Sequence, residues 1–110
     1  MNTVEDKNPG ALSNLWYGRT PMHFAAQNGY IDVVKFIAET LDEVNPRDAQ
    51  GLTPMHLAAF QGHQDVVKYL LDNTNGDKNP KTESGDVTPY KLAVTGGHAD
   101  IAKLLEPYAN

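Results

Sequence analysis

The sequence predicts an all-α protein, a solenoid in which helix-turn-helix units stack side by side and hairpin loops join them. Three observations predict this fold: a segment that recurs at a fixed period, Thr-Pro and Gly residues that bound a short helix in each copy, and an apolar stripe on the helix that follows. Such a unit cannot bury its apolar face alone, so stacked copies have to share one core.

The recurring segment begins at a glycine and contains Thr-Pro. Gly18–Ala26 (GRTPMHFAA) returns as Gly51–Ala59 (GLTPMHLAA), 33 residues later, and a more divergent copy runs over Gly85–Val94 (GDVTPYKLAV). Each copy is followed by a Gly and then by an Asp and a Lys in a second block. The predicted organisation is a leader or the remnant of an upstream repeat, three repeats and a tail, at residues 1–17, 18–50, 51–84, 85–107 and 108–110.

Each unit carries the signals that start and stop two helices. A Thr stands at the N-cap position with Pro as the first helical residue, and a Gly follows to end the helix in a left-handed conformation. The second helix has an Asp in its first turn, where the helix dipole favours a carboxylate. These residues are Thr20, Thr53 and Thr88; Gly29, Gly62 and Gly97; Asp32, Asp65 and Asp100. In the middle unit the buried stripe is predicted at Val66, Val67, Leu70 and Leu71.

This pattern, Gly-x-Thr-Pro-Met-His-x-Ala-Ala followed by Gly-His-x-Asp-Val-Val-Lys, resembles the ankyrin repeat. The resemblance spans about 90 of the 110 residues and implies an ankyrin-repeat solenoid that binds other proteins. It also implies that His23 and His56 hydrogen-bond to the capping Thr and to nearby backbone, and that His63 and His98 bridge to the backbone of an adjacent repeat.

The third copy departs from the family pattern. Lys91 replaces the expected His, Asp86-Val87 adds one residue before the capping Thr, and the preceding linker, Asn73–Asp77, is also one residue longer. We expect these differences to change the third hairpin and not the fold.

The leader contains a short match to the linkers between repeats. Asp6–Pro9 matches Asp77–Pro80, and both resemble Val44–Pro46. Residues 1–17 therefore fit either the tail and hairpin of an upstream repeat in a longer protein or a native leader with a chance match.

Composition excludes several classes of partner. Fourteen acidic and nine basic residues give a net charge of −5, which disfavours nucleic acid and anionic membranes. The absence of Cys and of an apolar targeting segment favours a cytoplasmic or nuclear protein. We expect a monomer.

The sequence offers no catalytic constellation. The recurring histidines fit structural roles, and the Asp residues that recur fit helix starts, so no acid and base pair is implied. We therefore expect no enzyme activity, no cofactor and no metal site.

Binding residues are predicted where the scaffold does not require the residue found. In ankyrin-like stacks these are the hairpin tips and the exposed side of each first helix, which form a concave face. The candidates are Trp16, Tyr17, Arg19, Gln27, Asn28, Gln50, Leu52, Phe60, Gln61, Asp86 and Thr95. The aromatic residues and Arg19 are the typical anchors of an interface. Trp16 and Tyr17 fit equally well as a cap over the open end of the first repeat.

The leading functional hypothesis is a non-enzymatic scaffold or adaptor that binds another protein or a peptide segment. The alternative is a regulatory segment of a larger enzyme or channel that docks on its own chain. Asn45 follows Leu41–Val44 at a place where ankyrin-like repeats can be hydroxylated, which makes it a candidate modification site, although a turn Asn explains it as well.

Overall fold

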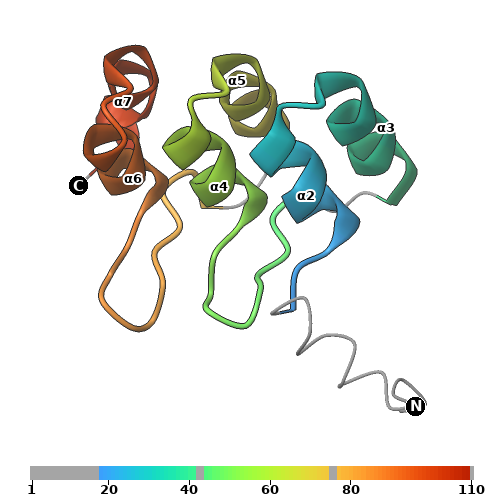
Figure 1. The fold of residues 1–110 in the computed structure, drawn as a ribbon, viewed down its shortest axis with the longest axis horizontal. Helices are drawn as coiled ribbons and strands as arrows, with labels where there is room; N and C mark the ends of the chain where they lie inside the picture. Colours follow the sequence, from blue (N-terminus) through green and yellow to red (C-terminus); the bar gives the residue numbers. More distant parts are fainter. Residues whose placement is uncertain (1–17, 42–43, 75–76, 110) are drawn as a thin grey trace.

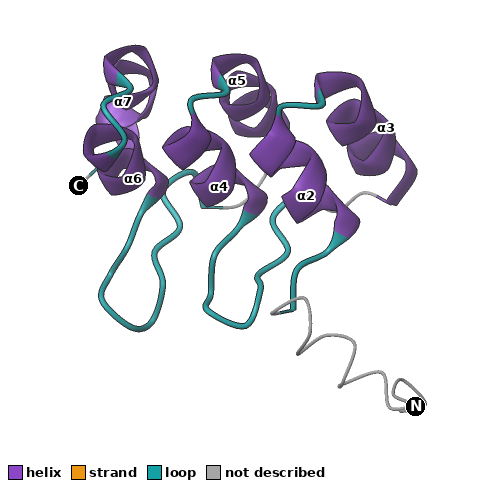
Figure 2. Ribbon diagram, viewed as in Figure 1, coloured by secondary structure: helices purple, strands orange, loops and turns teal. Residues whose placement is uncertain are grey.

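The computed structural model of the chain describes residues 18–41, 44–74 and 77–109, and these residues form three helix pairs in a row (Figure 1). None of the described residues lies in a strand (Figure 2). The pairs are α2 with α3, α4 with α5, and α6 with α7, followed by the 3₁₀ turn η1. Their bounds are Pro21–Asn28, Ile31–Leu41, Pro54–Gln61, Gln64–Asn73, Pro89–Thr95, Ala99–Leu105 and Glu106–Tyr108. The predicted all-α solenoid is confirmed.

The predicted caps form as the sequence indicates. The Thr20 and Thr53 side chains accept hydrogen bonds from the backbone N–H three residues ahead, each at 3.4 Å, and Thr88 does the same at 3.1 Å. Gly29 and Gly62 end α2 and α4 with φ of 74° and 88°, a region that costs a side chain energy. The first helix of each pair is therefore short because both of its ends are encoded locally.

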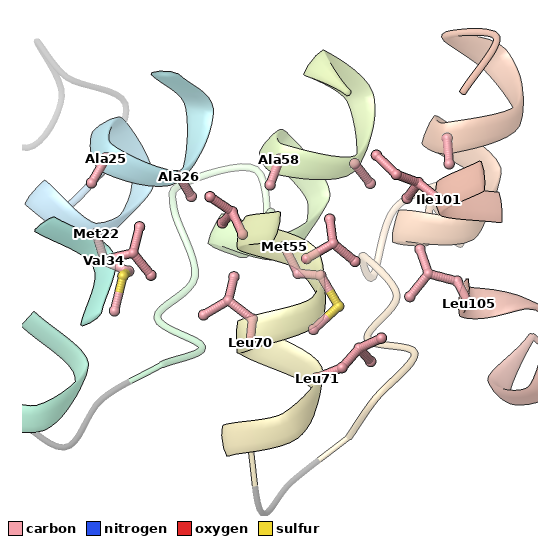
Figure 3. Packing of buried hydrophobic residues seen from close by; sticks show 14 of the residues in the cluster. Met22, Ala25, Ala26, Val34, Met55, Ala58, Leu70, Leu71, Ile101 and Leu105 are labelled. Atoms are coloured by element: carbon pink, nitrogen blue, oxygen red, sulfur yellow. The ribbon is translucent and has the colours of Figure 1, made fainter. Parts of the chain in front are cut away.

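One continuous apolar core runs through the three pairs (Figure 3). The predicted stripe on α5 is buried at all four positions. Alanine pairs on the first helices are also buried, which lets α2 and α4 approach each other closely. The core consists of Met22, Ala25, Ala26, Val34, Ala38, Met55, Ala58, Ala59, Val66, Val67, Leu70, Leu71, Ala93, Ile101 and Leu105.

Hairpin loops precede α4 and α6 and project to the same side of the row (Figure 1). In the loop before α4, the Asp48 backbone N–H donates to the Leu52 carbonyl oxygen at 2.9 Å. In the loop before α6, the Thr82 N–H donates to the Val87 carbonyl oxygen at 3.0 Å. The second loop closes one residue later, and Asp86 adopts a positive φ of 52° to accommodate it. The predicted change in the third hairpin is confirmed.

Candidate functional site

The recurring histidines hold neighbouring helix pairs together. His23 Nε2 lies 2.8 Å from the Leu52 carbonyl oxygen, and its Nδ1 accepts the Thr20 N–H at 3.0 Å. Because Nδ1 is an acceptor, the proton resides on Nε2, which donates to Leu52. This pair of bonds ties the start of α2 to the hairpin loop before α4. The structural role implied by the family resemblance is confirmed for His23.

A second set of histidines reaches in the opposite direction along the row. His63 Nε2 lies 3.0 Å from the Gln27 carbonyl oxygen, and His98 Nε2 lies 2.9 Å from the Phe60 carbonyl oxygen. Each imidazole therefore contacts the end of the preceding pair's first helix. The predicted bridge to adjacent backbone is confirmed for both residues.

His56 is a fully buried titratable group at the centre of the row. Burial lowers the pKa of His56 from its ordinary value of 6.5, and the nearby positive charge of Arg47 acts in the same direction. The hydrogen bond to the Val87 carbonyl and the Asp48 carboxylate oppose this effect. His56 is therefore held neutral inside the protein and has no solvent access for acid–base catalysis.

Neither a metal centre nor a membrane span is evident in the described part of the chain. Within residues 18–41, 44–74 and 77–109, no three His, Asp or Glu side chains gather to hold a metal ion. None of the helices described is long and apolar enough to cross a membrane.

A groove of about 610 Å³ opens between the two hairpin loops described in full. Leu52 and Val87 supply apolar surface in it, and Gln50 and Glu83 supply polar groups. The remaining lining residues are Arg47, Asp48, Ala49, Gly51, Thr82 and Ser84. The groove thus contains Gln50 and Leu52, two of the hairpin-tip residues that the sequence predicts for binding.

The candidates on the first helices lie near the ends of those helices. Phe60 is 42% exposed at the end of α4, beside the exposed Gln61. Asn28 and Thr95 are exposed at the corresponding ends of α2 and α6. We use the name inner surface for a set of residues from the groove, from the loop before α6 and from the ends of the first helices: Gln27, Asn28, Gln50, Leu52, Phe60, Gln61, Glu83, Asp86, Val87 and Thr95.

The side chains of Arg19 and Gln27 are hydrogen-bonded to each other, so the position of each depends on the other. Arg19 donates to the Gln27 side-chain oxygen at 3.0 Å and to the Asp48 carboxylate at 3.3 Å. Asp48, whose side chain is fully buried, also accepts the backbone N–H groups of Gln50 and Leu52. Arg19 therefore connects α2, through Gln27, to the hairpin loop before α4, through Asp48.

The other sequence-predicted residues are Trp16, Tyr17 and Asn45. Trp16 and Tyr17 lie outside the described residues. Asn45 is half buried, and its Nδ2 donates to the Thr74 hydroxyl at 2.6 Å while its Oδ1 is buried without a hydrogen-bond partner. Thr74 directly follows α5, so Asn45 links the linker after α3 to the end of the next pair.

Sequence reasoning missed the roles of Arg47 and Asp48. Arg47 donates to the Gly51 carbonyl at 2.8 Å and to the Lys81 carbonyl at 3.2 Å, so it joins the two hairpin loops along the groove. A signal was present, because Arg47 and Lys81 each follow an Asn-Pro dipeptide. Arg47 therefore connects the two loops that line the groove.

The comparison with protein families decides the identity of the fold. The family model described as ankyrin repeats (three copies) matches residues 2–82 and 41–110, which together span nearly the whole chain. The chain belongs to the ankyrin-repeat family. No curated protein gives a significant match to the chain.

Membership in this family assigns the general role of the fold. Ankyrin repeats generally mediate protein–protein interactions and are typically not catalytic. In this ankyrin-repeat chain the histidine bridges and the Thr-Pro caps serve the scaffold, while the inner surface carries residues that differ from one repeat to the next.

Proposed function

We propose that this ankyrin-repeat chain is a non-enzymatic scaffold or adaptor that binds a protein or peptide segment through its inner surface. The observation that carries the proposal is Phe60, an aromatic ring 42% exposed in the central pair. The equivalent positions hold Gln27 and Thr95, so the scaffold itself does not require an aromatic residue there. Exposed aromatic rings are common anchors of interfaces.

The groove between the hairpin loops supports the same proposal from a second side. Leu52 in the groove and Phe60 are separated along the chain by α4, an eight-residue helix about 12 Å long. A partner that contacts both would cover the groove and the end of the helix at once. Such a footprint is large enough to hold a short segment of another protein.

The histidine bridges support the choice of this surface over the others. His23 and His56 bind carbonyl oxygens of the hairpin loops, and His63 and His98 bind carbonyl oxygens at the ends of the first helices. Because these bonds fix the backbone, the inner surface is preorganised before a partner binds. A rigid surface loses less conformational entropy on binding. We expect the partner to contact side chains here and to leave the bridges intact.

The test is a capture experiment followed by a measured affinity. The chain is immobilised, a partner is captured from lysate and identified, and its affinity for the purified chain is determined. Leu52→Ala combined with Phe60→Ala is expected to weaken binding by about tenfold or more, the loss typical of interface anchors. Circular dichroism confirms that the variant is folded.

Phe36→Ala is the matched control, because Phe36 is a phenylalanine 67% exposed on α3, away from the first helices. It is expected to leave the affinity unchanged. Equal affinity of the parent and the Leu52, Phe60 variant would exclude the inner surface as the binding site.

The proposal includes the compartment, the oligomeric state and the repeat boundaries of the protein. We place it in the cytoplasm or nucleus as a monomer, with repeats at residues 18–50, 51–84 and 85–107. Arg19, Trp16 and Tyr17 are further candidate contacts, and hydroxylation of Asn45 stays a prediction that mass spectrometry of the native protein can check.

A further inference from the structure

Arg47 is a cation of the groove whose hydrogen-bonding groups are only partly used. The residue is exposed and lines the groove between the two hairpin loops, which project side by side (Figure 1). Its Nη1 donates to the Gly51 carbonyl oxygen at 2.8 Å and to the Lys81 carbonyl oxygen at 3.2 Å. Among the described residues, none supplies an acceptor to Nε or Nη2, and none forms an ion pair with Arg47. The guanidinium is therefore anchored at one nitrogen, and the N–H groups of the other two remain available.

The free edge of Arg47 has the geometry that binds a carboxylate. Nε and Nη2 lie on one edge of the planar guanidinium and can donate two parallel hydrogen bonds to the two oxygens of one carboxylate. The bonds at Nη1 already fix the side chain, so less conformational entropy is lost when a ligand binds. Lys81, which is exposed, stands at the equivalent position after Asn-Pro in the neighbouring loop. The electrostatic environment of the groove thus includes a second cation.

The acidic groups of the groove do not neutralise this edge. The carboxylate of Asp48 is fully buried and already accepts the Arg19 guanidinium and two backbone N–H groups of its own loop. Glu83 is exposed in the groove and forms no ion pair with Arg47. A carboxylate that reaches Arg47 therefore has to come from a partner.

Leu52 and Val87 supply apolar contacts at fixed positions in the same groove. They directly precede the capping Thr of the second and third repeats, and both are half buried. The Leu52 carbonyl oxygen accepts His23 Nε2, and the Val87 carbonyl oxygen accepts His56 Nε2. Because the backbone is held at both positions, the two apolar side chains stay at a defined place beside the Arg47 cation.

The loops favour an acidic side chain over the carboxylate at the end of a chain. A terminal carboxylate is commonly captured by a nest of free backbone N–H groups. Several N–H groups of the groove donate within their own loops instead, namely those of Gln50, Gly51, Leu52 and Val87. A side-chain carboxylate needs only the free edge of the guanidinium.

We propose that the groove binds an extended protein segment that places an Asp or Glu carboxylate on Nε and Nη2 of Arg47. A neighbouring apolar side chain of the same segment packs on Leu52 and Val87. This inference rests on the proposed binding function and adds the chemistry of the partner. It also makes Arg47, which lies outside the inner surface as defined above, the residue that selects for an acidic partner.

The test begins with random linear peptides displayed on phage and screened against the purified full chain. Enriched peptides are expected to share an acidic residue within a few positions of an apolar one. They are then synthesised with acetylated and amidated ends, so that only a side chain can supply the carboxylate. Replacing the shared acidic residue by its amide is expected to lower the affinity, measured by calorimetry, by about tenfold or more.

Variants of the chain identify the residue that the peptide contacts. Arg47→Lys keeps the charge but lacks the planar fork, so it is expected to weaken the acidic peptide by about tenfold and to leave the amide peptide unchanged. Glu83→Gln removes a repelling carboxylate from the groove and is expected to tighten the acidic peptide. Lys68→Gln is the matched control, because Lys68 is an exposed cation on α5 that does not line the groove. Circular dichroism confirms that each variant is folded.

Four results would overturn the proposal. They are no enrichment over the bare support, enriched peptides without a common acidic residue, equal affinity of the acidic and amide peptides for the parent chain, and an equal loss of both peptides in Arg47→Lys. The last would show that Arg47 only shapes the loops. If Arg47→Lys does not fold, the comparison of the two peptides on the parent chain decides the matter.

Failure of this inference is distinguishable from failure of the proposed function. Peptides without an acidic residue that bind the parent and are lost from the Leu52→Ala, Phe60→Ala variant would leave the inner surface as a binding site and exclude the carboxylate contact. A partner from lysate that binds the parent and that variant equally would exclude the inner surface itself.

Discussion

The imidazole of His56 lies between two adjacent repeats, with Nε2 2.9 Å from the Val87 carbonyl oxygen. Its Nδ1 accepts the Thr53 backbone N–H at 2.9 Å, which requires the neutral ring with the proton on Nε2. One side chain thus caps α4 and holds the hairpin loop before α6. The stability of the central repeat and the position of the groove depend on the same two bonds.

Replacing His56 is expected to destabilise the protein strongly. His56→Leu keeps an apolar volume but leaves the Thr53 N–H and the Val87 carbonyl without this partner. The expected loss is about 2 to 3 kcal/mol in the free energy of unfolding, measured by urea denaturation. Lys91→Leu is the control at the equivalent exposed position, with an expected change within about 0.5 kcal/mol. Similar losses in both variants would contradict the bridging role.

Stability is expected to fall as the solution becomes acidic. Burial lowers the pKa of His56 in the folded chain below 6.5, whereas the unfolded chain keeps the ordinary value. Between the two pKa values the unfolded chain binds more protons, so the free energy of unfolding rises with pH in that window and is fully regained above 6.5. The contribution of one group is at most about 1.4 kcal/mol per pH unit.

Urea denaturation at a series of pH values measures this dependence. The His56→Gln variant is expected to show a shallower slope below neutral pH than the parent, whatever its stability at neutral pH. Parallel slopes would show that another group is responsible.

Alanine at two left-handed glycines that follow first helices is expected to have unequal effects. Gly62 and Gly97 have similar φ values of 88° and 79°, so both substitutions carry the backbone cost of about 1 to 2 kcal/mol. A Cβ at Gly62 would also lie 2.7 Å from the His98 ring, whereas nothing lies within 4 Å at Gly97. Gly62→Ala is expected to cost about 1 kcal/mol more, since His98 must move from the Phe60 carbonyl. Thermal and urea unfolding of both variants check this, and equal losses would show that His98 adjusts freely.

Asp48 is expected to determine the shape of the hairpin loop. Its carboxylate accepts the Gln50 and Leu52 N–H groups and the Arg19 guanidinium, and its side chain is fully buried. Asp48→Ala is expected to lose about 2 to 3 kcal/mol, because several donors lose their acceptor. Arg19→Ala removes one of these bonds from a partly exposed side chain and is expected to lose about 1 kcal/mol or less. A double-mutant cycle measures their coupling, and additive losses would exclude it.

The sequence by itself determined the helices and the family. Thr53-Pro54 and Gly62 bound α4 through local backbone chemistry, and the four apolar positions of α5 follow from one helical period. Because these signals act within a few residues of each other, they are visible without the fold. The repetition of His23 as His56 likewise indicated a structural role in each unit.

Only the tertiary structure decided which side chains meet across repeats. Arg19 reaches Asp48, Arg47 reaches the Lys81 carbonyl, and Asn45 reaches Thr74, in each case across about thirty residues of chain. The exposure of Val33 at the end of the row, beside the burial of its counterpart Val66, is also invisible in the sequence. Burial depends on what a repeat stacks against, and the same residue type at the same repeat position is covered in one unit and open in another.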